Sequence, residues 1–149
     1  MKKFEFELES VRRYRHQQLR QAEIRLFECR RQLRHIAAEE TRLHHDLDSL
    51  MDQIMNSSGG LSPVSMMSRL QHVERLKEQI VAVERQKQHA EQKVRSAIDD
   101  CRHRKSEAEG LETIKAEQME AYRRQIRRDE ANLLAEIPLR NWNADGHVG

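Results

Sequence analysis

Two long stretches of apolar residues, spaced at alternating steps of three and four, constrain the fold of this chain more than any other feature. This spacing keeps a narrow apolar stripe on one side of an α-helix, as in the seam of a coiled coil. The first stripe comprises Leu19, Ala22, Leu26, Cys29, Leu33, Ile36, Glu40, Leu43, Leu47, Leu50 and Ile54. The second comprises Leu76, Ile80, Val83, Lys87, Ala90, Val94, Ala97, Cys101, Arg104, Ala108 and Leu111.

The composition favours a thin seam over a thick, rounded core. Of the 149 residues, 35% are charged, 37% are hydrophobic and only 4% are aromatic. This supply is too small for a large core, but it fills a seam that takes about two positions in seven. No stretch approaches the ~18 apolar residues that a membrane helix needs. We therefore expect a cytoplasmic protein without direct membrane insertion.

A short break between the stripes predicts the turn. Asn56 and the pair Gly59-Gly60 suit a helix C-terminus, and Ser62 followed by Pro63 suits the start of the next helix. We expect helix one over about residues 5–55, a turn at 56–62 and helix two over about 63–135. The fold class is then all-α, with residues 1–137 forming a single antiparallel coiled-coil hairpin and 138–149 forming a flexible C-terminal tail.

Antiparallel pairing of the two stripes gives a register in which most apolar positions find apolar partners. Leu19 faces Cys101 and Leu43 faces Leu76 in this register. Cys29 then lies roughly 15 Å from Cys101, given a rise of about 1.5 Å per residue, which is too far for a disulfide.

The same register predicts where the seam fails. Arg15 faces Arg104, and these like charges cost stability unless Glu107 or a partner compensates them. The stretch from Glu120 onward has no partner helix, so it is either frayed or available to bind a partner, and we favour the second interpretation. Its apolar residues are Tyr122, Ile126, Leu133, Leu134 and Ile137.

The sequence contains no recognisable catalytic constellation. Gly59-Gly60 lacks the Lys-Ser/Thr pair that follows a phosphate-binding glycine loop, and the two cysteines do not form a Cys-x-x-Cys motif. We expect a protein that is not an enzyme and that has no catalytic residue, no cofactor and no metal.

The charge distribution points to protein partners. The net charge of +2 comes from 27 basic and 25 acidic residues, which argues against a dedicated nucleic-acid binder. Eight arginines nevertheless lie between Arg12 and Arg34 against only Glu23 and Glu28. We favour an acidic protein partner for this segment, with nucleic-acid binding as the lesser alternative.

Three short segments of the chain resemble the flagellar export protein FliJ family, and they are distributed over nearly its whole length. The opening of the chain is similar to the family's opening through Phe4, Phe6, Leu8, Val11, Tyr14 and Arg15. The residues from Leu61 to Val73, with Leu76 and Gln79-Ile80, resemble the start of its second helix. Its C-terminal stretch is matched by Glu107, Leu111-Glu112, Ile114, Tyr122, Arg128, Glu130 and Ala135-Glu136-Ile137. Gly110 departs from the charged residue that is usual there.

The resemblance implies a non-enzymatic part of the flagellar type III export apparatus. It implies a stalk-like regulator of the hexameric export ATPase that also escorts export chaperones and links the ring to the export gate, a membrane protein. The protein would associate peripherally with the inner membrane at the flagellar base. The implied contacts with the ATPase ring are Leu8, Val11, Tyr14, Arg15, Tyr122, Arg123, Arg124 and Arg127. The implied contacts with the gate are His72, Leu76 and Gln79.

The sequence is also compatible with other functions. The chain could be the equivalent stalk of a virulence-type secretion system, a basic helical nucleic-acid binder or a generic structural coiled coil that forms homodimers. The seams could also pair between chains in a four-helix bundle, so the sequence leaves open a homo-oligomer in isolation.

Overall fold

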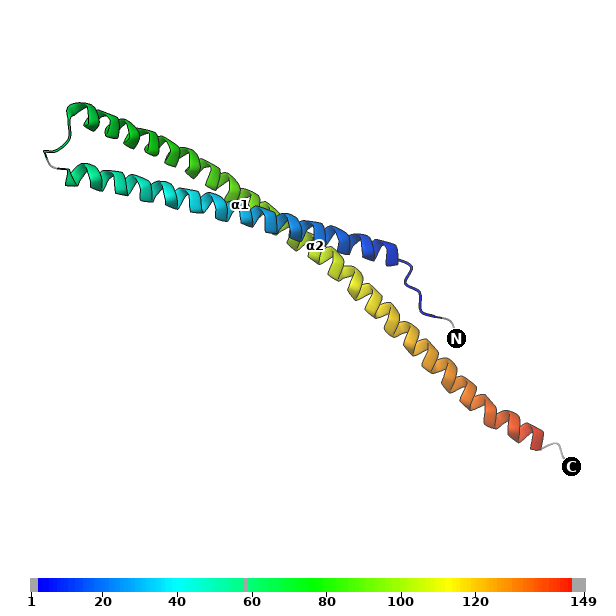
Figure 1. Ribbon diagram of the computed structural model, residues 1–149. Coiled ribbons are helices and arrows are strands. Elements are labelled where there is room, and N and C mark those ends of the chain that lie inside the picture. The colour runs from blue at the N-terminus through cyan, green and yellow to red at the C-terminus, as the bar shows by residue number, and fades with distance from the viewer. Residues whose placement is uncertain (1–2, 58, 146–149) are drawn as a thin grey trace. The chain divides into compact units, whose positions relative to one another are not determined.

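The computed structural model describes residues 3–57 and 59–145. Its elements are two α-helices, α1 (Glu9–Asn56) and α2 (Pro63–Asp145), and the described residues contain no strand (Figure 1). The chain divides into two compact units: unit 1 is Met1–Gln18 with Arg104–Gly149, and unit 2 is Leu19–His103. The two helices pack against each other, so the predicted all-α coiled-coil hairpin is confirmed.

A cluster of buried apolar residues lies in unit 2, near the turn. Its buried members come from both helices: Leu43, Leu50, Val73, Leu76 and Ile80. Each of them is at most 8% exposed, and Leu47, Ile54 and Val83 pack against them. Leu43 and Leu76, which the register set opposite each other, therefore share one core. Farther from the turn, the buried seam positions of unit 2 are the alanines Ala22, Ala90 and Ala97.

Glu40 of the first predicted stripe and Lys87 of the second contact each other. Lys87 Nζ lies 3.3 Å from Glu40 Oε2 in an ion pair, and both side chains are half-buried. Glu40 Oε1 also lies 4.0 Å from His44 Nε2. A charge in an otherwise apolar seam favours the one register that gives it a partner, because any other register leaves it buried and unpaired.

The turn has the local structure that its residues predict. Gly59 has a φ of +81°, a left-handed conformation that costs glycine little. Ser62 caps α2, because its Oγ accepts a hydrogen bond from the Ser65 backbone N–H at 3.2 Å, and Pro63 occupies the first helical position. The turn thus ends one helix and starts the next within a few residues.

Helix α1 begins at Glu9 and not near residue 5, where the sequence predicts its start. Phe4, Phe6 and Leu8 alternate with glutamates, and this period of two suits an extended segment better than a helix. Phe6 is only 8% exposed, and its carbonyl oxygen accepts a hydrogen bond from the Glu9 N–H at 3.1 Å. Burial of Phe6 therefore accompanies the later start of the helix.

Helix α2 continues to Asp145, so its predicted end near Ala135 is wrong. The sequence predicts that helix two ends before Pro138, because proline has no N–H to donate and its ring crowds the preceding turn. The helix instead continues through this position, and residues 138–145 are helical rather than a flexible tail. The last part of the predicted tail, residues 146–149, lies outside the described residues.

Cys29 and Cys101 are both free thiols, as the register predicted. Burial raises the pKa of the Cys101 thiol above its ordinary value, and the nearby charge of Glu23 adds to this effect. The thiolate that oxidation and metal binding require is thereby disfavoured at this position.

The apolar cluster should carry much of the stability of unit 2. Leu43 is 3% exposed, so Leu43→Ala should lower the free energy of unfolding by about 2–5 kcal/mol through lost burial and the cavity left behind. Val81→Ala is the matched control, because Val81 is 48% exposed and its truncation should change the free energy by less than about 0.5 kcal/mol. Urea unfolding followed by circular dichroism measures both, and equal effects would contradict the assignment of this core.

Candidate functional site

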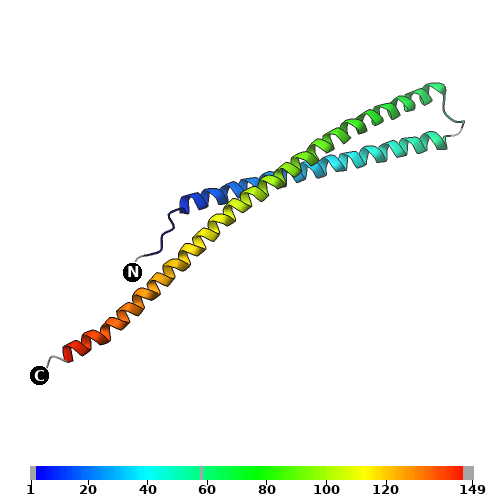
Figure 2. The same ribbon diagram turned by 180° about the vertical axis from the view of Figure 1, so that it is seen from behind.

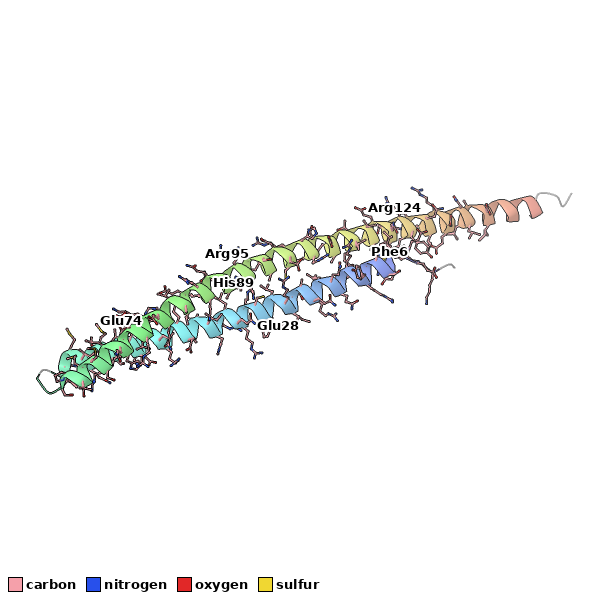
Figure 3. All side chains as sticks on the ribbon, turned by 90° about the horizontal axis from the view of Figure 1, so that it is seen from above. Phe6, Glu28, Glu74, His89, Arg95 and Arg124 are labelled. Carbon is pink, nitrogen blue, oxygen red and sulfur yellow. The ribbon has the colours of Figure 1, made fainter. Side chains whose placement is uncertain are left out.

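In unit 1, the extended N-terminal segment packs on α2 through aromatic side chains. The ring centroids of Phe4 and Tyr122 lie 5.5 Å apart with the planes tilted by 46°. Phe4 and Phe6 also line a shallow groove together with Lys115 and Met119 of α2. Figure 3 shows Phe6 beside α2 at this end of the chain. Tyr122 therefore packs on Phe4 of the same chain, although it lies in the stretch from Glu120 onward that the register leaves without a partner helix.

An ion-pair network joins the first turns of α1 to α2 next to this groove. Arg12 binds Glu9 through two hydrogen bonds, Nη2 to Oε1 at 2.6 Å and Nε to Oε2 at 2.9 Å. Arg12 Nη1 donates to Glu112 Oε1 at 2.7 Å, and His16 Nε2 lies 2.8 Å from the same oxygen. Lys115 Nζ lies 3.4 Å from Glu9 Oε2. The side chains of the network are partly exposed.

These contacts shift the pKa values of Glu9, Arg12 and Glu112. Hydrogen bonds from Arg12 lower the pKa of Glu9 from 4.5 to about 2. The hydrogen bond with Glu9 raises the pKa of Arg12 most, and the hydrogen bond with Glu112 adds to this effect. Hydrogen bonds from Arg12 and His16 also lower the pKa of Glu112. The two carboxylates thus stay charged well below neutral pH.

A second polar layer lies at the Arg15/Arg104 level, where the register predicted a clash of like charges. Glu107 Oε2 lies 2.7 Å from Arg15 Nη1 and 3.5 Å from Arg104 Nη1. Gln18 Oε1 accepts hydrogen bonds from both guanidinium groups at 3.2 Å, and its Nε2 donates to the Tyr14 hydroxyl at 2.8 Å. Glu107 therefore provides the predicted compensation.

Beyond Tyr122, the apolar residues of α2 are largely uncovered. Leu133, Leu134 and Ile137 are 59%, 67% and 50% exposed, and Ile126 is half-buried. This part of α2 extends past the N-terminal segment, as the view from behind shows (Figure 2). Apolar side chains of α2 between residues 123 and 137 are therefore largely exposed in this chain.

The residues predicted to contact an ATPase ring all belong to unit 1. Arg15 and Tyr122 are half-buried in the contacts described above, and Arg127 Nη2 lies 3.1 Å from Glu120 Oε1. The others are exposed: Leu8, Val11, Tyr14, Arg123, Arg124 and Arg127 itself. The structure brings the set into one unit, and its contact with a ring stays a prediction.

The residues predicted to contact the export gate belong to unit 2. His72 and Gln79 are exposed and seven residues apart, which places them on one face of α2. Leu76 is 5% exposed and belongs to the apolar cluster, so its side chain supports this face from inside. Only His72 and Gln79 remain available as direct contacts at this position.

Within the described residues, no group of three or more His, Cys, Asp or Glu side chains is arranged to hold a metal ion. In the same part of the chain, neither helix has a stretch both long enough and apolar enough to cross a membrane.

The family model of the flagellar FliJ protein matches residues 4–147 of the chain. The chain belongs to the FliJ family. This match covers nearly the whole sequence and confirms the resemblance, and it makes this FliJ protein a component of the flagellar export apparatus. No curated protein and no solved structure matches the chain.

Sequence reasoning missed the central residues of the unit 1 network. The spacing of Glu9 and Arg12, three apart on one helix, was a readable signal for a local ion pair. Extending the register to the start of α1 would also have brought Arg12 near Glu112. The packing of Phe4 on Tyr122 has no comparable signal, because the predicted helix over about residues 5–55 does not imply an extended N-terminal segment on α2.

The depressed pKa of Glu9 predicts an acid-sensitive contribution to stability. A carboxylate whose pKa falls on folding stabilises the protein above its unfolded value of about 4.5, and this stabilisation disappears as the pH falls to about 2. Glu9→Gln should therefore lower the thermal midpoint above pH 4.5, and the difference from the unmodified chain should vanish near pH 2. Glu117→Gln, at an exposed site of the same unit, is the control. A difference that stays constant across this pH range would refute the linkage.

Proposed function

We propose that this FliJ protein is a stalk-like, non-enzymatic regulator of the flagellar export ATPase ring. In this proposal, it also escorts export chaperones and connects the ring with the export gate. It acts in the cytoplasm, peripherally associated with the inner membrane at the flagellar base. The family match over residues 4–147 is the observation that carries the proposal.

Unit 1 supports contact with the ring. It contains both chain ends, and its part of α2 exposes apolar side chains next to arginines. Exposed Leu133 and Leu134 supply apolar area to bury, and Arg123, Arg124 and Arg127 supply charge that can orient a partner. The N-terminal segment braces this region, because Phe4 packs on Tyr122.

Unit 2 supports a separate contact with the export gate. His72 and Gln79 present polar groups on one exposed face of α2, next to the apolar cluster that holds α2 against α1. A rigid helix surface of this kind can bind a partner with little loss of conformational entropy. The ring and the gate would then use different units of the chain.

The ATPase contact can be tested with purified components. Adding the chain to the export ATPase should raise the rate of ATP hydrolysis and the hexamer fraction, and the chain alone should hydrolyse no ATP. Arg123→Glu/Arg124→Glu should weaken the apparent affinity by about tenfold, because reversed charges repel the partner surface. Hydrolysis assays and analytical ultracentrifugation measure the two effects.

The matched control is Arg75→Glu/Arg85→Glu, which makes the same charge change at exposed positions of unit 2. This variant should stimulate the ATPase as the unmodified chain does. If the chain changed neither hydrolysis nor ring formation, the proposed regulation would be wrong. If instead it bound RNA or DNA with a steep salt dependence, the nucleic-acid reading would gain support.

A further inference from the structure

Helix α1 carries a second stripe of residues, on the side facing away from the seam. We define the arginine–apolar face by Arg20, Ile24, Phe27, Arg31 and Arg34, which again follow steps of four and three. At about 100° per residue, this stripe lies roughly 150° around the helix from the seam residues Ala22 and Leu26. It belongs wholly to unit 2 and therefore lies outside the proposed ring contact.

The apolar members of this face are strongly exposed. Ile24 is 54% exposed and Phe27 is 63% exposed, although both could bury a large apolar area against a partner. They are adjacent on the helix surface, three residues apart, and arginines lie one turn away on either side. A central apolar pair with a charged rim is the usual arrangement of a protein interface.

The arginines of this face are not engaged within the described residues. Arg20, Arg31 and Arg34 form no ion pair there, whereas Arg12, Arg15 and Arg42 each bind a carboxylate. The segment 19–35 contains five arginines against two glutamates, Glu23 and Glu28. Figure 3 shows Glu28 on the outer side of α1 in this segment. The local excess of positive charge is therefore left for a partner.

We propose that the arginine–apolar face binds an acidic amphipathic helix of another protein. The apolar side of that helix packs on Ile24 and Phe27, and its carboxylates pair with Arg20, Arg31 and Arg34. Since the stripe follows steps of three and four, the partner helix lies nearly along α1, at the shallow crossing angle of about 20° that suits such ridges. From Arg20 to Arg34 the face is about 21 Å long, which is close to four helical turns.

The same chemistry argues against a nucleic acid as the occupant. A nucleic acid would pair its phosphates with the arginines, but it would leave Ile24 uncovered in the middle of the face. Base stacking uses several aromatic side chains along a groove, and this face offers Phe27 alone. An acidic helix with apolar residues satisfies both parts of the face.

A synthetic peptide provides the probe. We suggest a fluorescent amphipathic helix of about 21 residues with leucine at the a and d positions and glutamate at the flanking positions. A sister peptide with lysine in place of each glutamate and a single-stranded RNA oligonucleotide complete the set. Fluorescence anisotropy with the full chain should give saturable binding of the acidic peptide, at least tenfold tighter than binding of the lysine peptide.

Variants assign the binding to the proposed face. Arg20→Glu/Arg31→Glu and Phe27→Ser should each weaken peptide binding about tenfold, while circular dichroism shows unchanged helix content. Arg95→Glu/Arg102→Glu makes the same charge change at exposed positions of α2 and should stay within about twofold of the unmodified chain.

Three results would overturn the proposal. They are the absence of saturable binding, an equal loss in the Arg95/Arg102 variant, and tighter binding of the oligonucleotide that the Arg20/Arg31 change abolishes. The last result would assign the face to nucleic acid. None of these readouts involves the ATPase, so failure here is distinguishable from failure of the proposed regulation.

Discussion

Every other feature of unit 2 depends on the pairing of its two apolar stripes. An isolated polar helix gains little from its own hydrogen bonds in water, and packing of one face provides most of its stability. Leu43 and Leu50 of α1 supply that packing against Val73, Leu76 and Ile80 of α2. Since the seam uses a narrow stripe, most of the described side chains on the other faces of both helices are exposed.

The contacts between α1 and α2 differ in polarity between the two units. In unit 2 it is mainly apolar, with the Glu40–Lys87 pair as a polar exception. In unit 1, Arg15 and Arg12 of α1 reach α2 through Glu107 and Glu112, and apolar packing comes from Phe6 and Ala108. Half-exposed ion pairs contribute less stability than buried apolar contacts and are weakened by salt. The contacts between α1 and α2 in unit 1 should therefore be weaker and more salt-sensitive than the apolar contacts of unit 2.

The sequence predicted the features that repeat along a helix and missed those that do not. The 3–4 spacing sufficed to predict the two helices, the turn at Gly59 and the shared core of Leu43 and Leu76. It also located the layer where Glu107 compensates Arg15 and Arg104. The late start of α1 at Glu9 and the packing of Phe4 on Tyr122 depend on tertiary contacts of an extended segment, which periodicity does not encode. Likewise, the loss of one hydrogen bond at Pro138 did not decide where α2 ends.

The central claim is that the two stripes pair within one chain, in antiparallel register. Spin labels at Glu28→Cys and Arg95→Cys test it directly, in a chain whose Cys29 and Cys101 are replaced by alanine. The claim predicts an electron–electron distance below about 30 Å, because packed helix axes lie about 8–10 Å apart. That distance should persist when labelled chain is mixed with excess unlabelled chain. Loss of the short distance on mixing would show pairing between chains and would contradict the account.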